Sequence, residues 1–233
     1  MMLSVLIASA LVFDFLNGFH DSANLVATMI ASRAVSPRRA LALSAAAEFV
    51  GPFLFGVAVA VTVGKGLLDP DAVTLPVVLA AVWAAIGWNL LTWYFGLPSS
   101  SSHALVGGLL GAAVLSGGWR VVQLRGLFTV LLALFFSPVL GLLAGWLIMR
   151  LVLFLARGAT PRINTAFKRG QVLTSIGLAL SHGSNDAQKT MGIITLGLVV
   201  SGVVDSFSVP LWVVMASAAA SFANSLPPRK VCG

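Results

Sequence analysis

The sequence predicts an all-α polytopic membrane protein built from inverted-topology repeats, in which broken helices carry a pair of Asp motifs. The first observation is composition: 58% of the 233 residues are hydrophobic and only 9% are charged, whereas a soluble domain carries roughly 25% charged residues. The second observation is a short polar motif that occurs twice inside long apolar segments. The third is the position of two basic loops, which sets the direction of each segment through the membrane. Composition alone excludes an ordinary soluble domain.

The polar motif reads GFHDSAN at residues 18–24 and GSNDAQK at residues 183–189. In both copies an Asp follows a Gly by three positions, giving Asp21 and Asp186, and amide or imidazole side chains lie beside it. A carboxylate inside a membrane span costs several kcal/mol unless it is paired, protonated or hydrated. Because the motif is repeated in matching apolar surroundings, it predicts a functional site rather than a structural hydrogen bond between helices.

The apolar runs predict the helices. Residues 1–31 are too long for one straight helix across a core about 30 Å thick, so this segment is predicted to be a helix broken at Gly18. It is not expected to be a signal peptide, because it lacks a basic start and polar residues interrupt it. The remaining predicted spans, with a kink at Gly51-Pro52 in the first, are 40–63, 75–95, 121–156, 172–200 and a short piece at 210–223.

A serine-rich turn is predicted at residues 96–115, where four serines stand between Pro98 and His103. Such a sequence indicates a helix N-terminus or a re-entrant bend that lines a polar cavity, because unpaired backbone at membrane depth is tolerated only there. Two cytoplasmic loops require an even number of crossings between them. The serine segment must therefore cross, or 121–156 must be divided at Pro138. A crossing serine segment is favoured.

Two basic loops set the topology, one at residues 33–39 and one at residues 157–171. The net charge of +7 comes mostly from such loops and indicates orientation rather than nucleic-acid binding; both loops are expected in the cytoplasm. The first motif precedes its loop and the second follows its own, so the copies run antiparallel. Secondary transporters bind substrate and ion between such inverted repeats. The predicted division is a first repeat at 1–156, the cytoplasmic loop at 157–171, and an incomplete second repeat with a polar tail at 172–233.

The residue types suggest an anion held beside a cation. An anion needs hydroxyl donors and the N–H groups of helix N-termini, whereas a coupling cation needs carboxylate and carbonyl oxygens. Asp21 and Asp186 are the candidate cation ligands, for Na⁺ or a proton, and no other metal is expected. Lys189 is predicted either to extend toward the interface or to pair with an acid. The candidate anion ligands are Asn24, Ser99, Ser100, Ser101, Ser102, His103 and Gln188.

Three segments resemble the inorganic phosphate transporter (PiT) family, in particular its bacterial low-affinity branch. They are residues 18–24, 96–103 (GLPSSSSH) and 181–192 (SHGSNDAQKTMG), and the likeness covers roughly residues 1–215. The resemblance implies symport of inorganic phosphate, including as a metal–phosphate complex, with sodium or protons in the bacterial plasma membrane. It implies no cofactor and leaves a homodimer open. In the family the second repeat continues further, so a second repeat truncated after about Ala216 is expected.

The resemblance also implies transport roles for a set of polar residues. Asp21, Glu48, His182 and Asp186 match family positions associated with transport, and Asn185 is added to this coupling set. The alternatives are an ion channel or a non-transporting fragment of a transporter. An intramembrane hydrolase using Ser101 and His103 is disfavoured, because residues i and i+2 on a helix point apart and no Gly-x-Ser-x-Gly elbow is present. No enzymatic activity is therefore expected.

Overall fold

The computed structural model describes residues 1–69 and 73–224, apart from the side chains of residues 19, 20, 22 and 23; the predicted polar tail from 225 onward lies outside this range. No extended strand occurs in the described part, which confirms the all-α class. The helices are α1 (Met2–Ala31), α2 (Pro37–Leu54), α3 (Ala58–Val61), α4 (Leu75–Tyr94), α5 (Ser101–Gly117), α6 (Leu124–Leu155), α7 (Asn164–Val200) and α8 (Leu211–Asn224). A π-helical turn at Thr62–Gly66 continues α3.

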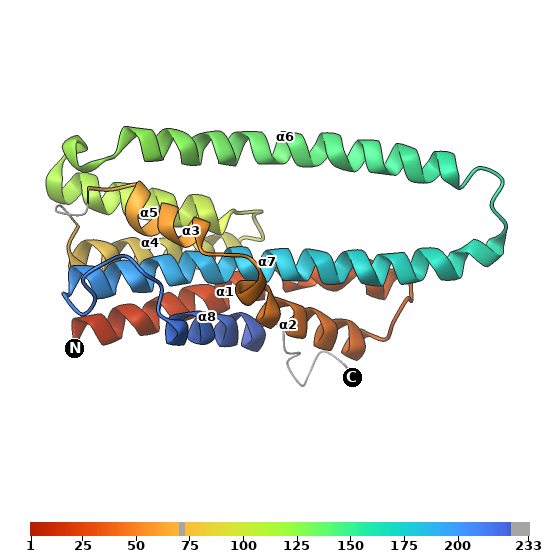
Figure 1. The fold of residues 1–233 in the computed structure, drawn as a ribbon, viewed down its shortest axis with the longest axis horizontal. Helices are drawn as coiled ribbons and strands as arrows, with labels where there is room; N and C mark the ends of the chain where they lie inside the picture. Colours follow the sequence, from red (N-terminus) through yellow and green to blue (C-terminus); the bar gives the residue numbers. More distant parts are fainter. Residues whose placement is uncertain (70–72, 225–233) are drawn as a thin grey trace.

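The two motif-bearing helices, α1 and α7, run antiparallel, as the inverted arrangement requires (Figure 1). The loops at 33–36 and 156–163 lie at the same end of the molecule (Figure 1). Between them the α2–α3 pair leads away from this end, α4 and α5 form a hairpin, and α6 leads back to it (Figure 1). By length and apolar composition α4 and α6 qualify as membrane spans, and α2 with α3 qualifies as one span bent by 68°.

The serine segment forms the tip of a hairpin. The helix α4 runs toward the end of the molecule that carries the basic loops, and α5 returns beside it (Figure 1). The tip stops short of that end, in the interior of the bundle (Figure 1). Because α4 begins and α5 ends at the same, opposite end of the molecule, the pair re-enters, and the crossing favoured for the serine segment is wrong (Figure 1). The even count comes from the α2–α3 pair and α6. The helix α6 continues through Pro138, so a division at Pro138 is also wrong.

The predicted breaks at the motifs are also wrong. The helix α1 is continuous through Gly18 and α7 is continuous through Gly183. Backbone N–H and C=O groups at membrane depth must be bonded, and an unbroken helix achieves this without outside partners. The interruption lies instead between α2 and α3, after the predicted kink at Pro52. The second basic loop is shorter than predicted, because residues 164–171 already belong to α7.

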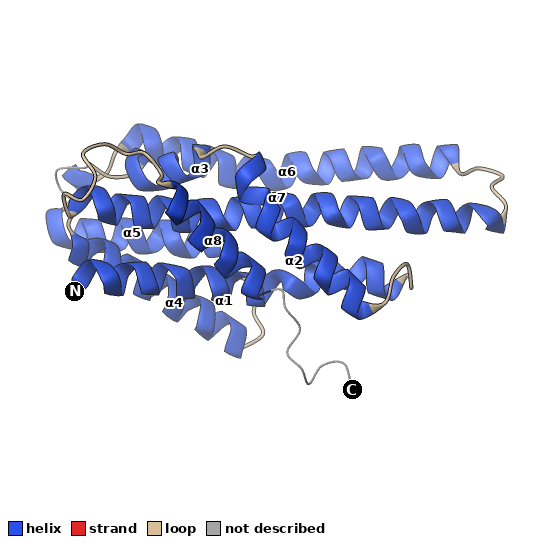
Figure 2. Ribbon diagram, turned by 60° about the horizontal axis from the view of Figure 1, so that its bottom comes forward, coloured by secondary structure: helices blue, strands red, loops and turns tan. Residues whose placement is uncertain are grey.

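Glycines allow α2 and α7 to cross with their backbones in contact. A Cβ atom added to Gly183 would lie 2.5 Å from the Cα and the carbonyl oxygen of Glu48, and one added to Gly192 would lie 2.7 Å from the carbonyl oxygen of Ala60. The helix α8 lies beside α2 and also packs on α1 and α7 (Figure 2). By contrast, α6 buries none of its residues and lies on the outside. The polar residues of α7 are thus enclosed by α1, α2 and α8.

Candidate functional site

His182 on α7 joins acidic side chains from three helices. Its Nδ1 lies 3.0 Å from Oε1 of Glu48 on α2, and its Nε2 lies 3.5 Å from Oδ2 of Asp21 on α1. The same Nε2 lies 3.5 Å from Oδ2 of Asp186, one turn further along α7. A neutral imidazole donates from only one ring nitrogen, so the ring donates to both Glu48 and Asp21 only as a cation. The close crossing at Gly183 brings Glu48 to this position.

The carboxylate of Asp186 faces two ways. Its Oδ1 forms an ion pair with Nζ of Lys189 at 2.7 Å. Its Oδ2 is buried and has no hydrogen-bond partner among the described residues, because the 3.5 Å contact with His182 is an ion-pair distance without hydrogen-bond geometry. Buried polar atoms of this kind are rare and call for an explanation such as an ion. Asp186 therefore connects two parts of the site.

One of these parts is a candidate cation site. A carboxylate oxygen from each of Asp21 and Asp186 and a ring nitrogen of His182 lie within 4.8 Å of one another. The two carboxylates suit a hard cation such as Na⁺, which binds oxygen, whereas imidazole is preferred by transition metals. The unpartnered Oδ2 of Asp186 fits a cation held by the carboxylates, with the ring of His182 kept in place by Glu48.

The serines at the tip of the hairpin have different partners. Ser99 Oγ accepts a hydrogen bond from the indole Nε1 of Trp88 at 3.0 Å. Ser100 caps α5, because its Oγ accepts from the backbone N–H of His103 at 3.4 Å. Ser101 Oγ accepts from Nζ of Lys189 at 2.9 Å. The start of α5, an N-terminus with the positive end of a helix dipole, is thereby attached to the charged cluster on α7.

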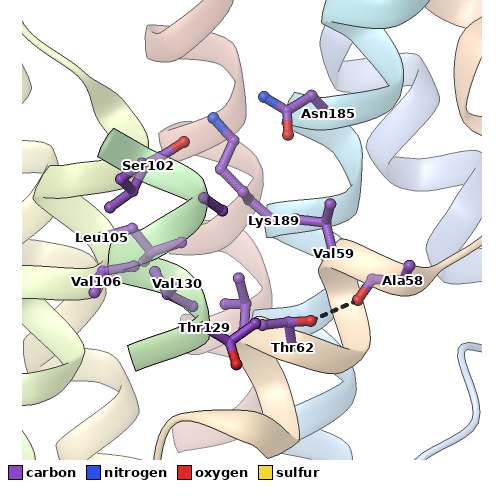
Figure 3. A pocket seen from close by; sticks show the side chains of 13 residues that line it. Ala58, Val59, Thr62, Ser102, Leu105, Val106, Thr129, Val130, Asn185 and Lys189 are labelled. Carbon is purple, nitrogen blue, oxygen red and sulfur yellow. Dashed lines mark hydrogen bonds between the residues drawn. The ribbon is translucent and has the colours of Figure 1, made fainter. Parts of the chain in front are cut away.

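A cavity of about 290 Å³ lies beside this contact, enclosed by α3, α5, α6 and α7. Its walls are mostly apolar, as is usual for ligand sites with a few directing polar groups. Figure 3 shows Nζ of Lys189 between the side chains of Ser102 and Asn185. Asn185, predicted with the coupling residues, thus lies on this cavity. The polar lining residues are Thr62, Ser102, Thr129, Asn185 and Lys189.

Besides the serines at 99–101, three more residues predicted to bind the anion do not line this cavity. The amide of Gln188 accepts from the N–H of Val59 at 2.9 Å and donates to the carbonyl of Phe55 at 3.3 Å and to Ser184 Oγ at 3.0 Å. It therefore satisfies the backbone at the α2–α3 break. His103 lines a separate groove between α4 and α5, because it follows Ser102 by one residue and faces another side of the helix. Asn24 is exposed on α1, one turn beyond Asp21.

Lys189 is the site residue whose role the sequence left open. It pairs with an acid, and its i,i+3 spacing from Asp186 was the available signal, since such residues are neighbours on a helix. A third buried acid, Asp14 on α1, has no hydrogen bond to His182, but its charge interacts with those of Asp186, Lys189 and Glu48. Both of its carboxylate oxygens lie 3.4 Å from the Oγ of Ser221 on α8. This contact joins α1 to α8.

Buried acids between antiparallel membrane helices, beside a polar helix tip, are typical of secondary transporters. The comparison with protein families agrees with this class: the model described as "Phosphate transporter family" matches residues 17–223. The chain belongs to this family. Its relatives are named as transporters, so the expectation that the protein is not an enzyme is confirmed.

The relatives include bacterial proteins named "Probable low-affinity inorganic phosphate transporter". One from Mycobacterium bovis is 43% identical over 231 residues, which covers 96% of this chain and 54% of the relative. One from Bacillus subtilis is 40% identical over 220 residues, covering 93% of this chain and 66% of the relative. This chain thus spans about half the length of the first relative and two thirds of the second.

A solved structure shares the fold. The chain described as "The sodium-dependent phosphate transporter" superposes with a TM-score of 0.78 at 20% identity, covering 96% of this chain and 74% of that one. With the family match and the candidate spans, this establishes an integral membrane protein of the predicted helical class.

Proposed function

We propose that this protein is a secondary transporter that moves inorganic phosphate across the membrane, coupled to sodium or protons. One observation carries the proposal: a buried carboxylate, Asp186, lies between a candidate cation site and the start of α5, where Ser102 and Lys189 line a cavity. The names of the relatives point to phosphate as the substrate. The structural neighbour is named as sodium-dependent, which points to sodium as one coupling ion.

Charge explains why transport would be coupled. Asp21, Glu48 and Asp186 face one ammonium and one imidazole, so the cluster carries two negative charges when His182 is neutral and one when it is protonated. Phosphate would be repelled from such a cluster in a low-dielectric interior. A cation or proton that enters beside Asp21 and Asp186 removes this repulsion. The anion would then accept hydrogen bonds from Ser101, Ser102 and the first N–H groups of α5.

Several finer points belong to the same proposal. We place the protein in the bacterial plasma membrane, because the relatives are bacterial. Carriage of phosphate as a metal complex and assembly into a homodimer are further predictions from the family resemblance. An ion channel or a non-transporting fragment would have the same buried acids. Saturable, cation-dependent uptake separates a transporter from both.

The test is uptake of inorganic phosphate by proteoliposomes, with the sodium gradient and pH varied separately. The wild-type protein should show saturable uptake that depends on one of the two ions. Asp21→Asn and Asp186→Asn should abolish this dependence, because each removes a charge from the candidate cation site. Asp205→Asn, at an exposed position outside the helices, is the matched control and should behave like the wild type. Wild-type uptake with unchanged ion dependence in both site variants would reject the assignment.

A further inference from the structure

Lys189 is a cation held inside the bundle. Its side chain is 3% exposed, and an isolated ammonium at such a place costs several kcal/mol. The ion pair with Asp186 at 2.7 Å and the hydrogen bond to Ser101 at 2.9 Å offset this cost. The side chain is thus fixed at the junction of the acidic cluster and the serine tip.

The geometry leaves Lys189 able to bind a further acceptor. An ammonium group has three N–H donors, and two of them serve Asp186 and Ser101. The same Nζ lies at the cavity between Ser102 and Asn185 (Figure 3). Ser102 offers a hydroxyl and Asn185 an amide, so an oxyanion in this cavity would meet three different donor groups.

We propose that Lys189 is the fixed positive charge of the anion site and exchanges partners during binding. An oxyanion that enters the cavity takes the ammonium of Lys189 away from Asp186. Both carboxylate oxygens of Asp186 then face the cation, where previously only Oδ2 did. This inference rests on the proposed function, and it adds that the bound anion strengthens the hold of Asp186 on the cation that entered before it.

The partner exchange has a consequence for charge. With Lys189 in the site, one positive charge of the bound state belongs to the protein and is not carried across the membrane. Removing this charge should therefore require one additional cation for each anion bound. Hydrogen bonds between ions are roughly twice as strong as neutral ones, so loss of Lys189 should also weaken anion binding.

The direct test uses the wild-type protein in lipid, labelled with ¹⁵N at lysine Nζ and saturated with inorganic phosphate. Solid-state NMR measures the dipolar coupling between ³¹P and ¹⁵N. A direct hydrogen bond of about 2.8 Å keeps phosphorus within about 4 Å of Nζ, and the coupled signal should disappear in Lys189→Gln. The chain has four lysines, which keeps the spectrum simple: Lys65, Lys168, Lys189 and Lys230. Lys168, whose Nζ donates to the carbonyl of Arg33 at 3.4 Å, is the internal control and should show no coupling.

The outcomes separate the two proposals. If no bound ³¹P signal forms, the proposed function and the inference both fail. If phosphate binds but no lysine nitrogen couples to it, phosphate binding stands and the role of Lys189 is refuted. A coupling to Lys189 supports the inference.

A variant series tests the charge argument. Lys189→Gln should lower phosphate affinity at least tenfold and steepen its dependence on the coupling ion by about one ion per phosphate. Lys189→Ala should recover part of this affinity when ethylammonium is added, because the missing group is replaced in the cavity. Lys168→Gln should match the wild type. A Lys189→Gln protein that is folded and binds phosphate with wild-type affinity and ion dependence would overturn the proposal.

Discussion

Replacing Gly183 with Ala should disconnect Glu48 from His182 without touching either side chain. The new Cβ would lie 2.5 Å from the Cα and carbonyl oxygen of Glu48, whereas carbon atoms in contact prefer about 3.5–4.0 Å. The helix α2 must therefore retreat by about 1 Å. The distance between Glu48 Oε1 and His182 Nδ1 would grow from 3.0 Å to about 4 Å, beyond hydrogen-bonding range.

The energetic cost follows from two effects. Overpacking costs about 1–3 kcal/mol, and a lost hydrogen bond to a charged group costs about 1.5–3 kcal/mol. The two effects sum to about 2.5–6 kcal/mol. At about 2–4 °C per kcal/mol, the melting temperature in detergent should fall by roughly 5–24 °C, and phosphate binding should weaken. Gly177→Ala is the matched control on α7, because a Cβ there meets no atom within 4 Å. If Gly183→Ala keeps the melting temperature and phosphate affinity of Gly177→Ala, the close crossing of α2 and α7 does not position Glu48.

Two further predictions concern topology and the α2–α3 break. For the topology, Cys232 is first replaced by Ser, and single cysteines are then placed at Arg38, Arg162 or Ser206. The first two should react with an impermeant maleimide only from the cytoplasmic side, and the third only from the opposite side. Labelling of the first two from different sides would contradict the antiparallel arrangement of α1 and α7. Gln188→Ala should lower the free energy of unfolding by about 2–4 kcal/mol, because it removes three hydrogen bonds worth about 0.5–1.5 kcal/mol each. Gln123→Ala, at an exposed position, is its control, and equal stability of the two variants would show that the break needs no partner.

Much of the helical framework could be predicted, because Gly, Pro and charged residues mark where the apolar runs begin and end. The span predicted at 75–95 is α4 at Leu75–Tyr94, and 121–156 is α6 at Leu124–Leu155. The kink predicted at Gly51-Pro52 lies within a few residues of the observed break between α2 and α3. The antiparallel direction of the motifs followed from the two basic loops, because positive charge places a loop in the cytoplasm however the helices pack.

The parts that could not be predicted depend on contacts between distant segments. Gly18 looked like a break, because glycine interrupts helices in isolation, but α1 continues through it, and Gly183 in the second motif serves the close approach of α2. Gln188 looked like a ligand, and only the fold shows the break that it satisfies. Which cavity each serine or His103 faces depends on the rotation of α5, and a run of four serines carries no information on that.

The α2–α3 break also bears on how the cavity could open. Val59 and Thr62, in the segment that begins with α3, line the cavity, and the amide of Gln188 spans the break with one bond to each side. Swinging this segment away from α7 would break those two bonds, at about 0.5–1.5 kcal/mol each, and would leave both long helices intact. Among the described residues, no atom lies within 4 Å of a Cβ added to Gly56 in the break itself, so a larger side chain there would meet no clash. A gate of this kind needs no helix to unwind, and its cost is set by these two hydrogen bonds together with the packing of α3 and the π-helical turn against α7.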